Sequence, residues 1–414
     1  MTTVEDALTR AHRTRNTFLR ITDERAAAVV SQGPLAGMPF AVKDIFDVRG
    51  TRTSAASRVF DDRPDASRDA EAVRRVTAAG AALIGKTTMS ELAYSGLGVN
   101  ERFGTPTLSR AGREHVVGGS SSGSAAAVRA GVVAFALASD TSGSARIPAA
   151  WVGVFGFRPS LGRYPSDGMT ALAPTLDTAG LIAARLEHVE AVDRILGGDP
   201  GPAPEVPVFV VPHEEYLSGC DGDVLDRFHA DLARLRAAGF RVAERRLESL
   251  ELARRLHRLH VPIVESEAYA AFGRYLEEPD LLSSQVRRRL ERARTRLRQG
   301  SADPLYGSVS SLRRQFRREL GNALLLSPAT EIDAPAYDDV RASAEAHDEV
   351  NARALALTMV LSYLDAPSLV IPFGGGGLPR SIQVSGASGW DGRVLRAARQ
   401  LGAAPGLSET ARHW

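Results

Sequence analysis

Two loops rich in glycine and serine, joined by an alanine-rich segment and an apolar run, constrain this chain most. Residues 118–124 read GGSSSGS, residues 140–144 read DTSGS, and the apolar run 132–138 lies between them. Small residues allow backbone amides to approach a ligand closely. If the apolar run is a buried strand, the two loops can bring two serine hydroxyls together. This arrangement favours catalytic chemistry.

Lysine is unusually rare in this sequence. Of 51 basic residues, only Lys43 and Lys86 are lysines. A GC-rich genome explains the bias, but arginine keeps its proton in proteins, whereas a buried lysine can become a neutral base. We therefore expect at least one of the two to be catalytic. Lys43 follows the apolar run 39–42 and precedes Ile45 and Phe46, an environment that lowers a lysine pKa from about 10.4.

Lys86 lies in a segment that matches a nucleotide-binding pattern. Residues 80–87 fit G-x-x-x-x-G-K-[ST], but a phosphate-binding loop of this kind connects a strand to a helix. Here the variable positions 81–84 are apolar and read as the strand itself. We therefore interpret Lys86 as structural, or as a polar group near the pocket, and predict no nucleotide site.

Composition excludes several classes of function. The 414 residues carry a formal net charge of +2 and include one cysteine, Cys220. Such a small charge predicts no nucleic-acid partner, and a single cysteine excludes an internal disulfide and indicates a reducing compartment. No secretory signal and no apolar run of about 18 residues is visible, so we expect a cytoplasmic protein without a membrane partner.

Periodicity suggests alternating helices and strands over much of the chain. Residues 4–30 read as one helix, and a helical segment at 69–79 is followed by Gly80 and the strand 81–84, which together form an αβ unit. Residues 250–320 read as mostly helical, and 285–320 are dense in arginine. The arginine-rich segment fits a solvated helix face with glutamate partners, an anionic-substrate entrance or a subunit contact.

Several segments, in the same order, resemble the amidase signature family of serine amidohydrolases. The central stretch is similar to the family's signature, from its Gly-Gly-Ser-Ser loop to the Arg and Pro that follow the second loop. The resemblance covers about residues 30–185 and, less densely, 325–400. The matching segments are 37–44 (GMPFAVKD), 85–91 (GKTTMSE), 118–148, 153–159 (GVFGFRP), 366–372 (APSLVIP) and 377–383.

The resemblance implies an α/β fold with a single large domain. It predicts a mixed central β-sheet covered by helices on both faces, spanning residues 1–414. The core would be formed by 30–185 and 325–400, with a variable helical insert at about 212–320. No cofactor and no metal is expected.

The resemblance also implies a catalytic triad. The nucleophile matches Ser144, the bridging serine with its cis peptide matches Ser120, and the lysine matches Lys43. Backbone amides of the loop ending at the nucleophile would form the oxyanion hole, and two residues of an earlier loop are expected to bind substrate. These oxyanion-hole and substrate-binding residues are Thr141, Ser142, Gly143, Ser144, Tyr94 and Ser95.

The residues support this chemistry independently. A serine hydroxyl is a poor nucleophile without a base, and only His115 among nine histidines lies near the serine loops in sequence. A neutral Lys43 could accept a proton from Ser120, which would take one from Ser144 as it attacks an amide carbonyl. This arrangement would be a serine–lysine variant of the Ser-His-Asp catalytic triad.

The predicted function is hydrolysis of a carboxamide or ureide bond in a small molecule, with release of ammonia or an amine. One alternative is the glutaminase subunit of a tRNA-dependent amidotransferase, although Ser122 and Ser142 stand where that form has glycine. Another is a non-hydrolytic binding or biosynthetic member of the fold. A homodimer is left open as the assembly state.

Overall fold

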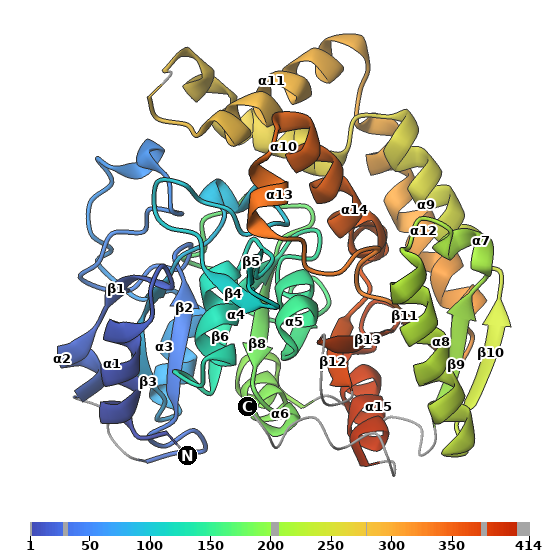
Figure 1. Cartoon of the computed structure of the whole chain (residues 1–414), viewed down its shortest axis with the longest axis horizontal. Coiled ribbons are helices and arrows are strands. Elements are labelled where there is room, and N and C mark those ends of the chain that lie inside the picture. The colour runs from blue at the N-terminus through green and yellow to red at the C-terminus, as the bar shows by residue number, and fades with distance from the viewer. Residues whose placement is uncertain (1, 28–31, 200–206, 279, 374–378, 404–414) are drawn as a thin grey trace.

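The computed structural model describes residues 2–27, 32–199, 207–278, 280–373 and 379–403. In this part of the chain, eleven strands form one mixed sheet in the order β1-β3-β2-β6-β8-β7-β12-β13-β11-β9-β10, and β4 and β5 form a separate hairpin. Helices surround the large sheet (Figure 1). The predicted single α/β domain with a mixed sheet is confirmed.

Parallel and antiparallel pairs alternate in blocks across the sheet. β2 runs parallel to both β3 and β6, and β9 runs parallel to both β10 and β11, while the remaining neighbours are antiparallel. The strands are β1 (Phe18–Ile21), β2 (Pro39–Lys43), β3 (Ala82–Thr87), β4 (Thr107–Arg110), β5 (Arg113–Val116), β6 (Phe135–Asp140), β7 (Phe155–Arg158), β8 (Thr178–Ala183), β9 (Val208–Pro212), β10 (Arg241–Arg245), β11 (Leu324–Ser327), β12 (Ser368–Phe373) and β13 (Arg380–Ser385).

Helices connect the strands and form a layer beyond their ends, where α10 and α11 lie at the top of Figure 1. The helices are α1 (Val4–Arg13), α2 (Asp23–Ala27), α3 (Glu71–Ala78), α4 (Ser122–Arg129), α5 (Arg146–Val152), α6 (Leu186–Gly197), α7 (Glu214–Leu217), α8 (Gly222–Ala237), α9 (Glu248–Leu259), α10 (Ile263–Phe272), α11 (Ser284–Gln299), α12 (Asp303–Leu320), α13 (Tyr337–Arg341), α14 (Ala344–Tyr363) and α15 (Asp391–Ala403), with 3₁₀ turns at Arg58–Phe60, Glu91–Ala93 and Gly273–Glu277.

Side-chain size differs between the two faces of the central strands. Successive residues of a strand point to opposite faces, and Phe40 and Phe135 stack on one face with ring centroids 5.3 Å apart. That face packs with α3 and α6. Ala41 and Ala136 point to the other face, which packs with α4 and α5. Small residues on this second face allow the helices next to the serine loops to approach the sheet closely.

The single helix predicted for residues 4–30 is wrong. Helix α1 ends at Arg13, and Phe18–Ile21 form β1, which pairs antiparallel with β3 at the edge of the sheet. Strand pairing overrides local helix preference in such a segment. The β1 backbone passes so close to β3 that a Cβ at Gly85 would lie 2.3 Å from the carbonyl oxygen of Arg20.

The segment predicted as a helical insert also contributes a strand. Helices α7 to α12 dominate residues 212–320, but β10 lies within this segment and, with β9 just before it, extends the sheet beyond β11 at its far edge. The two strands tie this segment into the same sheet as the rest. That it varies among relatives stays a prediction.

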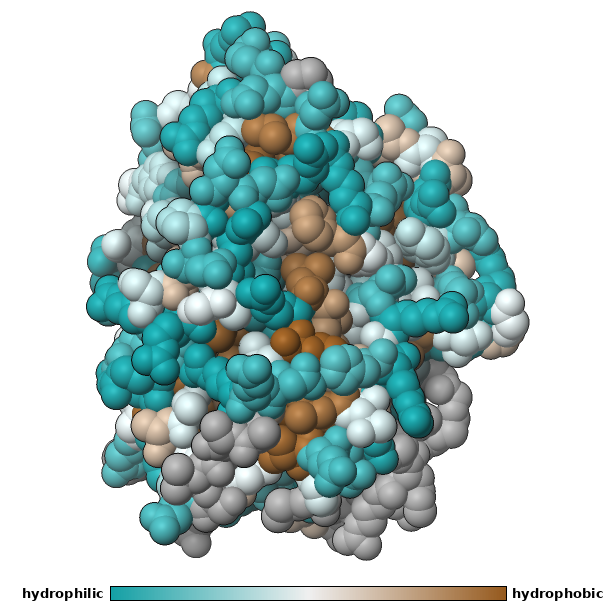
Figure 2. Space-filling view, turned by 90° about the vertical axis from the view of Figure 1, so that its left-hand side faces the viewer, coloured by the Kyte–Doolittle hydropathy of each residue, from teal (hydrophilic) through white to brown (hydrophobic). Residues whose placement is uncertain are grey.

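Large apolar side chains are scattered on the surface. Of those described, Val208, Leu259 and Tyr306 are exposed. The side of the molecule shown in Figure 2 is mostly hydrophilic, with a narrow apolar strip at its centre. No helix in the described ranges is long and apolar enough to cross a membrane.

Candidate active site

Lys43 lies in the interior at the end of a central strand. It is the last residue of β2, which runs parallel to β6, and its side chain is fully buried. The ammonium nitrogen Nζ donates to the Oγ of Ser120 at 2.6 Å and to the Oγ of Ser139 at 2.8 Å. The structure therefore joins Lys43 and Ser120, two of the three residues predicted to be catalytic.

Burial changes the protonation of this lysine. Loss of water lowers the pKa of Lys43 to about 7, although the negative charges of Asp177 and Asp140 oppose the shift. Asp177 accepts a hydrogen bond from Thr141 Oγ1 at 2.6 Å. A large fraction of Lys43 is consequently neutral near pH 7, as a general base requires.

Backbone hydrogen bonds hold the two serine loops side by side. The peptide bond between Gly119 and Ser120 is cis. The amide of Ser121 donates to the carbonyl of Ser144 at 3.2 Å, and the carbonyl of Ser120 accepts from the amide of Ser90 at 3.0 Å. Gly119 has no room for a side chain, because a Cβ there would lie 2.4 Å from the amide nitrogen of Gly98.

A buried ion pair shapes the second loop. The Asp140 carboxylate accepts from the Nη2 and Nε of Arg146, each at 2.9 Å, and from the amides of Gly143 at 2.8 Å and Ala145 at 3.2 Å. Burial alone would raise the pKa of Asp140, but Arg146 and the amides hold it at about 2. The loop thus folds around a fixed negative charge at the start of α5.

The Gly143 amide is committed to Asp140, which corrects one expectation for the oxyanion hole. An amide that donates to a buried carboxylate is not available to a developing oxyanion. In the described part of the chain, the amides of Thr141, Ser142 and Ser144 donate no hydrogen bond. These three amides remain as candidate donors, and those of Ser142 and Ser144 are the nearest in sequence to the predicted nucleophile.

A cavity of about 640 Å³ opens in front of these loops. Predicted residues that line it are Ser144, Thr141, Ser142, Tyr94 and Ser95, whereas Lys43, Ser120 and Gly143 do not. Both Lys43 and Ser120 are fully buried, while Ser144 keeps 4% of its surface exposed. Lys43 and Ser120 therefore lie inside the protein, and Ser144 is the member of the predicted triad that meets the cavity.

Ser142 adds a hydroxyl to the cavity wall. Its carbonyl accepts from the Oγ1 of Thr358 on α14 at 2.6 Å, which fixes its backbone. Its own Oγ is buried and has no hydrogen-bond partner among the described residues. A buried hydroxyl without a partner is unfavourable, so this oxygen suits a polar group of a ligand.

Sequence reasoning missed two contributors to the site and left the role of a third open. Ser139 accepts from Lys43, Asp177 places a negative charge near the same lysine, and helix α11 brings arginines to the cavity wall. Ser139 directly precedes the second loop, so its position at a strand end was a usable signal. Asp177 carried no local signal. The arginine density of 285–320 was visible, and a substrate entrance was one of three readings of it.

Lys86, the second lysine, makes contacts that hold neighbouring segments together. Its Nζ lies 2.7 Å from an Asp44 carboxylate oxygen and donates to the Arg52 carbonyl and the Thr53 hydroxyl, each at 2.9 Å. It lies within β3, so residues 80–87 contain a strand where a phosphate-binding loop would be needed. The structural interpretation of Lys86 therefore agrees with the geometry.

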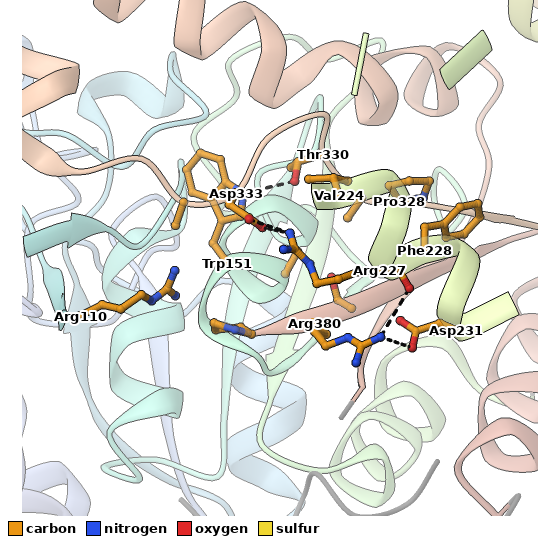
Figure 3. Close-up of a pocket in the computed structure, with 15 residues that line it drawn as sticks. Arg110, Trp151, Val224, Arg227, Phe228, Asp231, Pro328, Thr330, Asp333 and Arg380 are labelled. Carbon is orange, nitrogen blue, oxygen red and sulfur yellow. Dashed lines mark hydrogen bonds and ion pairs between the residues drawn. The ribbon is translucent and has the colours of Figure 1, made fainter. Parts of the chain in front are cut away.

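A second hollow, of about 40 Å³, lies beside Trp151 (Figure 3). Two ion pairs line it, Arg227–Asp333 at 2.6 Å and Arg380–Asp231 at 2.7 Å. The hollow is more than tenfold smaller than the first, and these arginines already have carboxylate partners. The two ion pairs link α8 to β13 and to the neighbouring loop, so we interpret this region as structural.

A mixed sheet whose central strand presents a buried lysine to a serine, behind a serine-lined cavity, is an architecture suited to amide hydrolysis. The family model described as Amidase matches residues 5–395, and the chain belongs to this family. The resemblance noted in the sequence is thereby confirmed, and so is the general class of enzyme, a hydrolase of amide bonds.

Relatives whose names indicate different activities are identical to this chain to about the same extent. The chain is 32% identical to a glutamyl-tRNA(Gln) amidotransferase subunit of Roseiflexus castenholzii, over 91% of this chain and 84% of the relative. It is 33% identical to AtzE, which is part of the 1-carboxybiuret hydrolase of Pseudomonas sp. strain ADP, over 89% and 84%. A crystal structure of an amidase matches with a TM-score of 0.82 and 32% identity, covering 96% of this chain and 94% of that one.

Proposed function

We propose that this enzyme hydrolyses a carboxamide or ureide bond of a small molecule, with Ser144 as nucleophile, Ser120 as proton relay and Lys43 as base. The observation that carries the proposal is the hydrogen bond of 2.6 Å between Lys43 and Ser120, made by a lysine whose pKa burial lowers to about 7. A neutral amine paired with a hydroxyl can pass a proton onward, which a permanently charged group cannot.

The chemistry proceeds in two halves. Ser144 Oγ attacks the amide carbon while its proton moves to Ser120 Oγ and the proton of Ser120 moves to Lys43 Nζ. The amides of Ser142 and Ser144 stabilise the oxyanion, a contribution of about 3 kcal/mol for each donor. Protons return through Ser120 to the leaving amine, and water then hydrolyses the acyl-enzyme by the same route.

The test combines labelling with turnover. A serine-reactive fluorophosphonate should label the wild type but not Ser144→Ala, and ammonia release from a panel of small amides and ureides should disappear in Ser144→Ala, Ser120→Ala and Lys43→Met. Lys86→Met is the matched control, because it removes the other buried lysine. Full labelling of Ser144→Ala would reject Ser144 as the nucleophile.

A second candidate is the ammonia-supplying subunit of a tRNA-dependent amidotransferase. The similarity to such a subunit over most of both chains favours it. Ser122 and Ser142, where that form has glycine, weigh against it. Glutamine belongs in the panel for this reason: its hydrolysis in preference to simple amides, together with co-purification of partner subunits, would favour the second candidate.

A further inference from the structure

Arginines are the most numerous charged residues in the wall of the cavity. The cavity is lined by three carboxylates, Glu265, Glu331 and Asp348, and by six arginines, Arg254, Arg258, Arg289, Arg292, Arg296 and Arg353. Burial and the neighbouring arginines lower the pKa of His257 to about 4, so this histidine adds no charge near neutral pH. The cavity wall therefore carries a net positive charge.

Three of the six arginines have carboxylate partners. Arg292 pairs with Asp348 at 3.1 Å, Arg296 with Glu265 at 3.3 Å, and Arg353 with Asp221 at 2.6 Å. The first two of these ion pairs also fix α11 to α14 and to α10. The net positive charge of the cavity wall therefore lies on the other three arginines, Arg254, Arg258 and Arg289.

Two of the remaining three share a counter-charge. Arg254 and Arg258 both lie on α9, and the Glu331 carboxylate is close enough to both for their charges to act on its pKa. Arg254 also stacks on the ring of Tyr216 at 3.7 Å. Glu331 therefore offsets part of their charge.

Arg289 differs from the other five in being buried. It lies on α11 with 6% of its surface exposed, and among the described residues no carboxylate lies within ion-pair distance of it. The charges of Asp348 and Glu265 reach it, but both carboxylates already pair with other arginines. One of its nitrogens, Nη1, donates to the carbonyl of Tyr94, and its guanidinium lies 5.3 Å from the centre of the Tyr94 ring. Its Nε is buried and has no partner in the described part of the chain.

A buried guanidinium without a counter-ion is unfavourable unless an anion reaches it. A carboxylate fits best, because its two oxygens match the planar fork of an arginine. Tyr94, which Arg289 contacts, lines the same cavity as Ser144. A bound carboxylate would thus share the cavity with the nucleophile.

We propose that the substrate carries a carboxylate group that Arg289 binds while the scissile amide lies at Ser144. This inference rests on the proposed function and narrows it to the monoamides of dicarboxylic acids and similar anionic amides or ureides. Arg289 then sets specificity: it holds the anionic end, and the serine loops act on the other end.

The first experiment compares matched substrates. Succinamate and its neutral methyl ester differ at the carboxylate, so the ratio of their kcat/KM values isolates recognition of the charge. Arg289→Gln should lower that ratio by about 10- to 100-fold, the range expected for a hydrogen bond to a charged group. Arg294→Gln is the control, because Arg294 lies on the same helix outside the cavity, 3.9 Å from Glu277. An equal ratio for wild type and Arg289→Gln would overturn the proposal.

A second experiment separates this inference from the proposed function. Succinate, but not neutral succinamide, should protect wild-type Ser144 from a fluorophosphonate, and Arg289→Gln should lose that protection. If Ser144 is never labelled, the proposed function fails, and calorimetric binding of succinate to the wild type and to Arg289→Gln still decides the inference. Stronger protection by a phosphonate analogue than by succinate would overturn the carboxylate assignment.

Discussion

The Nζ of Lys43 lies 2.6 Å from the Oγ of Ser120, and both side chains are completely buried. The lysine has no carboxylate within ion-pair distance among the described residues, whereas Lys86 on the adjacent strand has Asp44 at 2.7 Å. Two buried lysines on neighbouring strands thus have opposite environments. That contrast separates a group suited to proton transfer from one that stabilises the fold.

Activity should rise with pH around the pKa of Lys43. The base is active when neutral, and burial lowers the pKa of Lys43 to about 7, so kcat/KM should increase from pH 6 to 8 with a midpoint near 7. Lys43→Arg should lose about 10²- to 10⁴-fold in kcat/KM, since arginine keeps its proton. Rates measured with a neutral amide in buffers of constant ionic strength test this, and a flat profile would contradict it.

The same shift predicts how stability depends on pH. Between about pH 7 and 10.5, Lys43 is charged in the unfolded chain and neutral in the folded protein. Unfolding then takes up a proton, so this lysine makes the free energy of unfolding rise with pH across that window. Below about pH 7, Lys43 is charged in both states, so it no longer makes the free energy of unfolding depend on pH. Urea unfolding of the wild type and Lys43→Met at several pH values measures the difference, which should grow with pH in favour of the wild type.

The two lysines should respond differently to methionine substitution. Lys86→Met leaves the Asp44 carboxylate buried without its partner, and we expect a loss of about 3–5 kcal/mol in unfolding free energy. Lys43→Met leaves hydroxyls rather than a charge unpaired and should cost about 1–3 kcal/mol. Turnover per folded molecule should survive Lys86→Met and disappear in Lys43→Met. If turnover per folded molecule falls equally in the two variants, the roles assigned here are wrong.

The ion pair between Asp140 and Arg146 should be a main determinant of stability. Both side chains are fully buried, and Arg146 also donates to Ser362 on α14 at 2.9 Å. Arg146→Met should therefore lower the unfolding free energy by about 3–5 kcal/mol. The Asp140 pKa of about 2 lies below its ordinary 3.8, so the pair stabilises above pH 3.8 and is lost as pH falls through 2. In acid titrations followed by circular dichroism, the variant should unfold at a higher pH.

The sequence predicted those parts of the site that lie in continuous segments. Lys43 was recognisable because it ends an apolar run, and Ser120 and Ser144 because each lies in a loop of small residues. The pairing of β2 with β6 then places Lys43 near Ser139, next to the loop that carries Ser144. Local patterns sufficed because a parallel sheet brings the carboxyl ends of neighbouring strands to one edge.

Other features depend on contacts between distant segments, which local patterns do not encode. Arg289 contacts Tyr94 across 195 positions of sequence. Arginine density indicated a charged helix but not which arginine enters the cavity or which lacks a partner. The strand β1 was missed for a related reason, because its pairing with β3 outweighs the helical character of residues 4–30.

Gly143→Ala should inactivate the site, because there is no space for a side chain at this position. Gly143 has φ +130°, and a Cβ there would lie 2.3 Å from Thr358 Oγ1, whose hydrogen bond fixes the Ser142 carbonyl. The loop or α14 must move, which displaces the amides of Ser142 and Ser144. A misplacement of about 1 Å in such a site costs about 10²-fold, and we expect at least that loss in fluorophosphonate labelling rate and in kcat/KM.

Gly112→Ala provides the matched control for that variant. Gly112 also has positive φ, +77°, but nothing lies within 4 Å of the position its Cβ would take. An alanine there should cost only the backbone strain, about 1–2 kcal/mol in unfolding free energy, and leave the labelling rate unchanged. If Gly143→Ala reacted with the fluorophosphonate as fast as Gly112→Ala, close packing by Thr358 would not be what positions the two amides.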